Sequence, residues 1–394
     1  MIRRLISLLG TDRVARLDER IRPALIAHLP PRLAIRLYSA PRDAYLAALK
    51  HEPVDDPVTP PASCSREFWG VAFQAPIMNA AGLFKAGAAG YDLAADQGAG
   101  AYLAGTFTPR PRRGNTVQGV TKPFVPLPRS DASVNSMGLP NPGFATRDAM
   151  GYDRSAQANI AAIDRRQGVP VGASVMGTPG NTGTPDYADE VVDGLAAMAD
   201  AGADFAEINE SCPNTERTLP QETGLGDRLA AVADKFLATS DLPVVVKFSV
   251  DTPVEQVPEI VDLLLDHGFH GVNFGNTSTA YDDHRKRIDA AERDAYDTFT
   301  AEIGGGVGGR PIADRSLALS TAAADRVEER DPDRDFMVVR TGGIEDTDDV
   351  DTSLDRGIGM TQWYTGYWKM FAAHGHDVYR ALLSGLDGTG GGAS

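Results

Sequence analysis

A cysteine flanked by amides stands near the middle of the chain, in the segment Glu207-Ile-Asn-Glu-Ser-Cys-Pro-Asn-Thr215. The apolar residues that lead to this segment predict a strand that ends at Asn209, and Pro213 turns the chain just after Cys212. A thiolate is the reactive form of cysteine, and an exposed polar loop is where its pKa can be lowered for use as a base. A lone cysteine more often packs as a small hydrophobic residue, but the neighbouring Asn, Ser and Pro-Asn favour a catalytic role for Cys212.

Two further sets of polar residues stand where apolar runs end. The first set can both donate and accept hydrogen bonds: Asn135, Asn209, Asn214, Asn276 and Thr277. Each Asn taken singly is more often a turn or cap residue. Because buried amides without partners are costly, the set as a whole indicates a pocket for a polar ligand. The second set is Lys85 and Lys247, whose ammonium groups would stabilise negative charge, although most lysines are solvated surface residues.

The elements that must position these residues alternate along the chain. Short apolar runs that end in Gly, Asn or Thr alternate with helical stretches rich in Ala, Leu and Asp, which predicts βα units and a parallel sheet. We predict eight strands, at Ile77–Asn79, Ala101–Gly105, Val169–Ser174, Phe205–Asn209, Pro243–Lys247, Gly271–Phe274, Phe336–Thr341 and Gly359–Tyr364. Eight such strands favour a closed (β/α)8 TIM barrel, an α/β fold that places its chemistry at the carboxyl ends of its strands.

We expect the barrel to occupy residues 67–386. Before it we predict a small helical extension over residues 1–50, where apolar residues recur at helical spacing and Pro30-Pro31 interrupts the helices. A Pro-rich linker follows over residues 51–66, and the Gly-rich tail 387–394 is expected to be disordered. The extension holds ten basic and four acidic residues, a net charge of +6, against −16 for the whole chain.

Composition and charge exclude several classes of protein. Hydrophobic residues make up 42% of the 394 residues, so a sizeable core is expected. The negative net charge argues against nucleic acid as a partner, because phosphate binding needs a basic surface. Two cysteines, Cys64 and Cys212, do not indicate a disulfide framework, and no His or Cys spacing indicates a metal site. We see no membrane-spanning run or signal peptide, so a reducing cytoplasm is the expected location.

The motif Asn-x-Ser-Cys-Pro-Asn resembles the active-site loop of the class 1 dihydroorotate dehydrogenases, in which the Cys is the catalytic base, whereas class 2 enzymes have Ser there. Other segments resemble the family in the same order over almost the whole barrel. Asn79–Lys85 and Gly105–Asn115 are similar to class 2 enzymes, and Asn135–Asn141 is similar to the class 1 substrate loop. The segments that resemble the flavin-binding turns of the family are Gly305–Pro311, Thr341–Ile344 and Tyr364–Gly366.

The resemblance implies an FMN enzyme that oxidises dihydroorotate to orotate in pyrimidine (UMP) biosynthesis. Cys212 would remove the proton from C5, and FMN would accept the hydride from C6. The residues implied to bind substrate are Lys85, Asn135, Met137, Gly138, Asn209, Asn214, Asn276 and Thr277. Those implied to bind FMN are Ala81, Gly82, Lys85, Thr106, Ser174, Asn209, Lys247, Gly275, Gly309, Gly342, Gly343, Tyr364 and Thr365.

The barrel leaves the electron acceptor open. Class 1 enzymes, which this chain resembles at Cys212, use fumarate or, through a partner subunit, NAD. Class 2 enzymes carry an N-terminal helical extension that rests on the membrane and admits a quinone. Residues 1–50 have the apolar stripes and the Arg residues that this role needs, and each basic residue near an anionic lipid surface contributes about 1 kcal/mol. An extension that only packs on the barrel explains the pattern nearly as well. Lys85 and the Thr108-Pro-Arg-Pro segment favour the quinone, with the enzyme at the inner face of the cell membrane.

Two other functions are weighed against this one. A flavin enzyme of the same fold could act on another dihydropyrimidine or on an unrelated carbonyl compound. A membrane-bound flavoprotein scaffold with a decayed site conflicts with the presence of Lys85, Asn135, Cys212 and Asn276. The sequence leaves the oligomeric state open.

The chain also departs from the family pattern. Ser174 stands where class 2 enzymes have Asn, and the loop after Asn214 lacks the common Pro-Gly. The charged segment Tyr281–Asp297 is atypical of the family, and its basic tetrad His284-Arg-Lys-Arg287 is expected to be a solvated helix face.

Overall fold

The computed structural model describes residue 6 and residues 9–85, 87–145, 152–165, 168–181, 184–210 and 224–386. Its centre is a parallel sheet in the order β3-β15-β14-β12-β11-β10-β9-β4. The strands of this sheet are β3 (Ile77–Asn79), β4 (Tyr102–Phe107), β9 (Val171–Val175), β10 (Phe205–Asn209), β11 (Val244–Ser249), β12 (Gly271–Asn276), β14 (Met337–Thr341) and β15 (Met360–Trp363). Each agrees with a predicted strand to within two residues at either end, and the predicted (β/α)8 barrel is confirmed.

The first and last strands of the sheet, β3 and β4, meet through a side chain. The Asn79 amide donates to the Leu103 carbonyl (2.8 Å) and accepts from the Leu103 N–H (3.2 Å). One backbone bond, from the Gly100 N–H to the Ile77 carbonyl, adds to this contact. An amide can pair with a strand in this way because it carries both a donor and an acceptor. The Asn79 side chain therefore ties the two edges of the barrel together.

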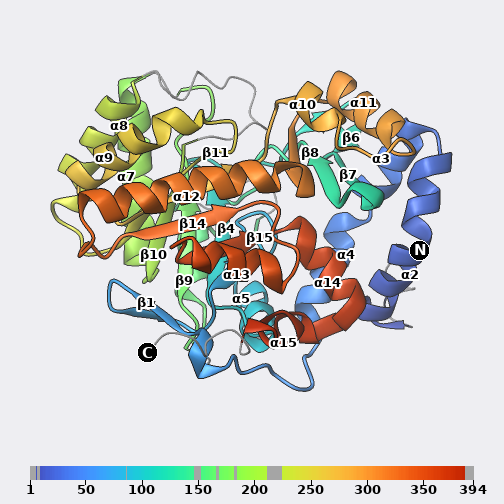
Figure 1. The fold of residues 1–394 in the computed structure, drawn as a ribbon, viewed down its shortest axis with the longest axis horizontal. Coiled ribbons are helices and arrows are strands. Elements are labelled where there is room, and N and C mark those ends of the chain that lie inside the picture. Colours follow the sequence, from blue (N-terminus) through green and yellow to red (C-terminus); the bar gives the residue numbers. More distant parts are fainter. Residues whose placement is uncertain are drawn as a thin grey trace.

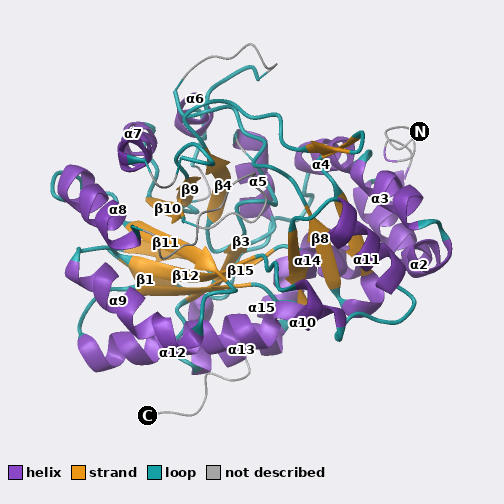
Figure 2. Cartoon of the chain, turned by 90° about the horizontal axis from the view of Figure 1, so that it is seen from above, coloured by secondary structure: helices purple, strands orange, loops and turns teal. Residues whose placement is uncertain are grey.

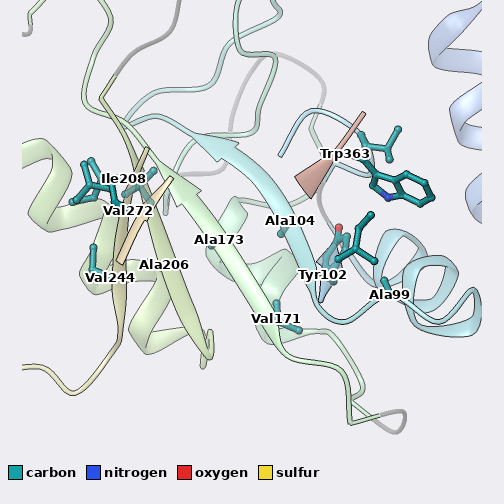
Figure 3. Close-up of a cluster of buried hydrophobic side chains, with 14 of the residues drawn as sticks. Ala99, Tyr102, Ala104, Val171, Ala173, Ala206, Ile208, Val244, Val272 and Trp363 are labelled. Atoms are coloured by element: carbon teal, nitrogen blue, oxygen red, sulfur yellow. The ribbon is translucent and has the colours of Figure 1, made fainter. Parts of the chain in front are cut away.

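Helices surround the barrel, as the purple ribbons around the orange strands show (Figure 2). They are α5 (Ala88–Asp96), α6 (Ala156–Ala161), α7 (Pro185–Asp200), α8 (Leu225–Val232), α9 (Val257–Asp266), α12 (Ala313–Arg330), α13 (Thr347–Asp355), α14 (Thr365–His374) and α15 (Val378–Leu383). The main core lies between these helices and the outward-facing side chains of the strands, including those of Val171, Ala173, Ala206, Ile208, Val244 and Val272 (Figure 3). These side chains are fully buried because both faces of a parallel sheet are covered.

Inside the barrel, the side chains change from apolar to polar along each strand. At the amino ends, Phe205, Val245 and Met337 form an apolar cluster with Phe68, Trp69 and Phe73 of a hairpin, and the hairpin covers this end of the barrel. The hairpin strands are β1 (Arg66–Phe68) and β2 (Val71–Phe73). Two and four residues further along the barrel strands, the same inward face presents mainly polar or charged residues, namely Glu207, Asn209, Lys247 and Thr341. The alternation therefore directs the ligand site to the carboxyl ends of the strands.

A second, smaller core lies beside the barrel. Its centre is an antiparallel sheet in the order β13-β8-β7, which the sequence analysis did not predict. Its strands are β7 (Phe124–Leu127), β8 (Ala132–Asn135) and β13 (Gly306–Gly309), and the short hairpin strands β5 (Thr116–Val117) and β6 (Val120–Thr121) lie nearby. The helices α10 (Tyr281–Arg285) and α11 (Arg293–Glu302) pack against this sheet.

The expectation that the basic tetrad is a solvated helix face is wrong for its first residue. His284 is buried, and its Nε2 lies 2.6 Å from the Ser278 hydroxyl. Arg285 and Arg287 are solvent-exposed, and they pair with Asp297 and Asp314 respectively. The helical period explains this difference, because α10 packs one of its faces against the second core and leaves the other face in water.

Over residues 11–51, which the structure describes, the chain forms the helices α2 (Thr11–His28), α3 (Pro31–Ser39) and α4 (Arg42–His51). Pro30 precedes α3, as predicted, and Pro41 separates α3 from α4. Figure 1 shows α2 (blue) beside α14 (red), and α3 packs on β7 and α11. The extension thus bridges the barrel and the small sheet. The predicted disordered tail, 387–394, lies outside the described residues.

Candidate active site

A polar cavity of about 160 Å³ opens at the carboxyl ends of the barrel strands. Residues in or directly after every barrel strand except β9, together with residues of the small sheet, line it. Most of the residues predicted from the sequence lie on its wall, namely Ala81, Gly82, Lys85, Thr106, Asn135, Met137, Asn209, Lys247, Gly275, Asn276, Thr277, Gly309, Gly342, Gly343, Tyr364 and Thr365. The carboxyl ends of parallel strands meet at one end of a barrel, so residues that are far apart in the sequence come together here.

Four predicted residues are not placed on this wall. Ser174 is fully buried and accepts a hydrogen bond from the Thr106 hydroxyl (3.1 Å), so it lies behind Thr106. Gly138 has a φ of +68°, and a Cβ there would overlap the side chain of Asn115. Its role in the structure is a tight turn. Cys212 and Asn214 lie outside the described residues.

A pair of amides forms one wall of the cavity. Asn276 donates from Nδ2 to the Asn209 Oδ1 (3.0 Å), and its own Oδ1 accepts from the Thr277 N–H (3.1 Å). The Thr277 hydroxyl is buried and makes no hydrogen bond to any described residue. A buried hydroxyl without a partner costs about 1–3 kcal/mol. Its position on the cavity wall therefore points to a ligand that completes its hydrogen bonding.

A buried cluster of charged and amide groups lies deeper in the barrel, and it includes Glu207, which the sequence analysis did not select. Glu207 accepts hydrogen bonds at Oε2 from the side chains of Asn273 (2.8 Å) and Gln362 (3.0 Å). The Gln362 Oε1 in turn accepts from the Lys247 ammonium (3.0 Å). Glu207 and Lys247 both line the cavity, and both are more than nine-tenths buried. A signal was present in the sequence, since Glu207 is a charged residue inside an apolar strand.

The electrostatics of Lys247 follow from this cluster. Burial lowers the pKa of Lys247, and the negative charge of Glu207 opposes the shift. Gln362 donates to one of these residues and accepts from the other, so it orients both charges without direct contact between them. The cluster therefore holds the Lys247 ammonium on the cavity wall, where it can stabilise an anion.

Another part of the cavity lining is built from backbone. Gly342 and Gly343 follow β14 with φ of +103° and +75°, and a Cβ on Gly343 would lie 2.3 Å from the Cβ of Ala313. Helix α14 begins at Thr365, and its N-cap residue Tyr364 makes no side-chain capping bond. The first N–H groups of a helix lack partners within the helix and attract anions. These groups fit a phosphate, and the amides and Lys247 fit a polar ring, so the residues fit a flavin mononucleotide.

A second cavity, of about 330 Å³ and mainly apolar, lies between the N-terminal helices and the barrel. Its apolar walls come from α2, α3, α4, the small sheet and α14, and they include Val14, Ala15, Leu25, Leu46, Phe124 and Trp368. The residues that line both cavities are Arg42, Ser133, Tyr364, Thr365 and Gly366.

Arg42 of α4 lies at this junction and was not among the predicted site residues. Its guanidinium donates to the Tyr364 hydroxyl (2.7 Å) and lies 5.7 Å from the centre of the Phe124 ring. The apolar cavity therefore ends at residues that also line the polar one.

The fold and the site define an α/β-barrel protein with an anion-stabilising ligand cavity at the carboxyl ends of its strands. Residues 63–386 match the family model of dihydroorotate dehydrogenase. The chain belongs to the dihydroorotate dehydrogenase family.

Several relatives are similar over most of their length. The chain is 32% identical to the dihydroorotate dehydrogenase (quinone) of Rhodococcus opacus over 318 residues, which are 80% of this chain and 78% of the relative. It is 29% identical to the protein of the same name from Mycobacterium marinum over 98% of this chain and 93% of the relative. Among solved structures, DHODH of Eimeria tenella in complex with ferulenol superposes with a TM-score of 0.67 at 20% identity. It covers 87% of this chain and 89% of that chain, and it supports the fold alone.

Proposed function

We propose that this protein is an FMN-dependent dihydroorotate dehydrogenase that oxidises dihydroorotate to orotate in pyrimidine biosynthesis. The observation that carries this proposal is the convergence of the family motifs on one polar cavity with a buried Lys247. Fifteen other predicted site residues line the same cavity. The alternative of an unrelated carbonyl substrate would not need the amide pair and the unpartnered Thr277 hydroxyl.

The described residues bind and orient the reactants in this proposal. Asn209, Asn276 and Thr277 present donors and acceptors to the polar edges of dihydroorotate. Lys85 supplies a positive charge on the cavity wall for the substrate carboxylate. FMN, when bound, supplies the acceptor for the hydride that leaves C6. The buried ammonium of Lys247 favours the added negative charge.

Cys212 is the proposed base for the C5 proton. This assignment rests on the sequence motif, because Cys212 lies outside the described residues. The motif begins at Asn209, which lies on the cavity wall at the end of β10. The sequence segment that carries Cys212 therefore follows directly after a residue of the cavity wall. Proton removal by a positioned side chain accelerates such a step by roughly 10²–10⁴-fold.

We propose a quinone as the oxidant of the flavin. The apolar cavity supports this acceptor because a quinone is a largely apolar molecule, and the cavity ends at residues that also line the polar cavity. The relatives named above are called quinone enzymes. Fumarate or NAD as the acceptor would leave the apolar lining of this cavity unexplained.

The N-terminal helices also offer a surface for a membrane. Leu17, Ile21, Leu33 and Leu37 of α2 and α3 are each at least two-fifths exposed. Arg13, Arg16, Arg20 and Arg36 lie on the same two helices and are exposed as well. Exposed leucines among arginines are typical of helices that lie on an anionic lipid surface. None of the described helices is long and apolar enough to cross a bilayer. We propose peripheral attachment to the inner face of the cell membrane.

An oxidant panel tests the proposal on the purified, FMN-loaded chain. Under anaerobic conditions, dihydroorotate should bleach the flavin absorbance, and a soluble quinone should restore it much faster than fumarate, NAD or oxygen. A flavin that stays oxidised with dihydroorotate but is reduced by another dihydropyrimidine would refute the substrate. Faster recovery with fumarate or NAD would refute the quinone and leave the substrate standing.

A further inference from the structure

An ionisable side chain stands on the wall of the apolar cavity. Glu345 follows the glycine turn after β14 and is 3% exposed. Its Oε1 is buried and makes no hydrogen bond to any described residue. A buried carboxylate is strongly disfavoured unless it is paired or takes up a proton. This carboxyl therefore has one oxygen for which the described residues provide no partner.

The other oxygen of Glu345 leads to the surface. Oε2 lies 3.4 Å from the Lys369 ammonium and 3.5 Å from the Arg310 guanidinium, and these two side chains are 50% and 41% exposed. Lys369 also lies 2.8 Å from Asp131, which is one-third exposed. A continuous set of charged groups thus runs from solvent to a carboxyl on the cavity wall.

The other acidic side chains of this wall are held in different ways. Asp18 accepts hydrogen bonds from Arg22 (2.7 Å) and from the Tyr38 hydroxyl (3.1 Å). Glu19 lies 2.9 Å from the same Arg22. Both carboxylates are therefore paired with Arg22. Among the described contacts, Arg22 does not connect to Glu345. Among the described acidic residues of this wall, only Asp131 belongs to the same charged set as Glu345, through Lys369.

A quinone that is reduced in this cavity needs two electrons and two protons to become a quinol. The reduced flavin would be an anion if the Lys247 ammonium stabilises its negative charge, and it would then supply two electrons and one proton. The second proton must come from the protein or from water, and the apolar walls of the cavity do not favour water. A carboxyl on the wall that connects to solvent through charged side chains meets this need.

We propose that Glu345 donates the second proton to the quinone, an inference that rests on the quinone as the acceptor. The O–H bond of the Glu345 carboxyl breaks, an O–H bond of the quinol forms, and the two electrons come from the reduced flavin. The carboxylate then regains a proton from solvent on the side of Lys369 and Asp131.

The electrostatics around Glu345 suit a group that gains and loses a proton near neutral pH. Burial raises the pKa of Glu345 to about 7, and the negative charge of Asp131 adds to the shift, while Arg310 and Lys369 oppose it. Asp346 and Asp349 of α13 face the same Arg310, and Asp18, Glu19 and Arg22 of α2 line the same cavity. Because the donor must be protonated, reoxidation by quinone should slow as the pH rises through about 7.

The test uses the full chain loaded with FMN. The flavin is reduced anaerobically with dihydroorotate and then mixed with a soluble quinone or with ferricyanide in a stopped-flow instrument over a range of pH. Ferricyanide takes electrons without protons. Glu345→Gln keeps the shape of the side chain and removes its proton. We expect this variant to be reoxidised by quinone roughly 10²-fold more slowly, without the fall near neutral pH, and by ferricyanide at the wild-type rate.

Asp346→Asn is the matched control. It removes one negative charge from the same Arg310, and an Asn there can still cap α13, where the Asp346 Oδ1 accepts from the Asp349 N–H (3.1 Å). It should behave as the wild type does. Slow reoxidation of Glu345→Gln by both oxidants would overturn the proposal, and so would quinone reoxidation at the wild-type rate and pH profile.

The wild-type protein provides a measurement that does not depend on any variant. Its reoxidation by quinone should be slower in D₂O, and its reoxidation by ferricyanide should not. A quinone reaction that is independent of both pH and D₂O would also overturn the role of Glu345. If fumarate or NAD reoxidises the wild type but quinone does not, the proposed electron acceptor is wrong. This result differs from a failure of Glu345 as the proton donor, in which quinone still reoxidises the flavin.

Discussion

Cys212 is the residue on which proton removal depends in the proposed reaction. Cys212→Ala should keep FMN bound and slow its reduction by dihydroorotate by roughly 10²–10⁴-fold, because no side chain then takes the C5 proton. The rate of flavin reduction in Cys212→Ser should lie between the rates of the wild type and Cys212→Ala, since a hydroxyl is a weaker base than a thiolate. The measurement is anaerobic stopped-flow absorbance of the flavin.

The other cysteine of the chain provides the control for this prediction. Cys64 is buried in the main core, away from the cavity lining. In Cys64→Ala, dihydroorotate should reduce the flavin at the wild-type rate. Normal flavin reduction in Cys212→Ala would remove Cys212 from the role of base.

The buried cluster of Glu207, Gln362 and Lys247 should affect the midpoint potential of the flavin. The negative charge of Glu207 raises the pKa of Lys247 against the effect of burial. Glu207→Gln removes this buried negative charge from the cavity wall, so the reduced, anionic flavin should be more stable and its midpoint potential should rise. A gain of about 1.4 kcal/mol corresponds to roughly 30 mV for two electrons.

A redox titration with reference dyes measures this shift. Glu302→Gln is the control, because Glu302 pairs with Arg32 and does not line the cavity. The midpoint potential of the flavin in this variant should equal that of the wild type. An unchanged potential in Glu207→Gln would show that the cluster supports the fold without acting on the flavin.

At the scale of elements, the N-terminal helices and the barrel together enclose the apolar cavity. Ala15 of α2 lies on its wall and is buried. Ala15→Phe should fill part of the cavity and lower turnover with a quinone about tenfold or more, which corresponds to about 1.4 kcal/mol. Bleaching of the flavin by dihydroorotate should not change, because the substrate residues lie in the other cavity.

The control is the same substitution, Ala to Phe, at Ala40, which does not line the apolar cavity. It is exposed at the end of α3, and Ala40→Phe should turn over quinone at the wild-type rate. If Ala15→Phe and the wild type reduce quinone equally, the oxidant reaches the flavin by another route.

The elements were largely predictable, with one clear gap. The strands of the barrel follow from short apolar runs that end in polar residues, and the structure places them within two residues of the prediction. The small sheet was missed because its strand β13 consists of Gly306-Val-Gly-Gly309, which resembles a turn. Its partner β8 supplies the hydrogen bonds that hold it extended, and such pairing does not show in local sequence.

The whole molecule carries an uneven charge. The extension has a net charge of +6 while the whole chain has −16, and the exposed leucines lie on that extension. Leu17→Glu combined with Leu37→Glu should weaken binding to vesicles of anionic phospholipid at least tenfold. Each Leu side chain contributes roughly 1.5–3 kcal/mol when it is buried in an apolar environment, and each new Glu is repelled by the lipid charge.

Cosedimentation with the vesicles at low ionic strength measures this binding. Val254→Glu is the control because Val254 is similarly exposed, at 46%, but lies on the barrel next to α9. It should bind as the wild type does. Equal binding of the double variant and the wild type would return the extension to a purely packing role.

Sequence by itself determined the barrel, the family and most of the polar wall. The alternation of apolar and polar positions sets which face of each strand looks inward, and the closed barrel then brings the strand ends together. Lys247, Asn209 and Asn276 could be chosen for this reason. Glu207 shows the limit of that reasoning, because a carboxylate inside an apolar strand has meaning only once its partners on β12 and β15 are known.

Only the tertiary structure decided how the N-terminal helices relate to the site. The sequence favoured a quinone-admitting extension and a packing extension almost equally. In the structure, α2, α3 and α4 enclose an apolar cavity that reaches Tyr364, and they bring Arg42 to its end. They also leave Glu345 buried on that wall, although it follows the last of these helices by 294 residues (345 − 51) in the sequence. Contacts over such separations depend on the shapes of two packed surfaces, and no local pattern encodes them.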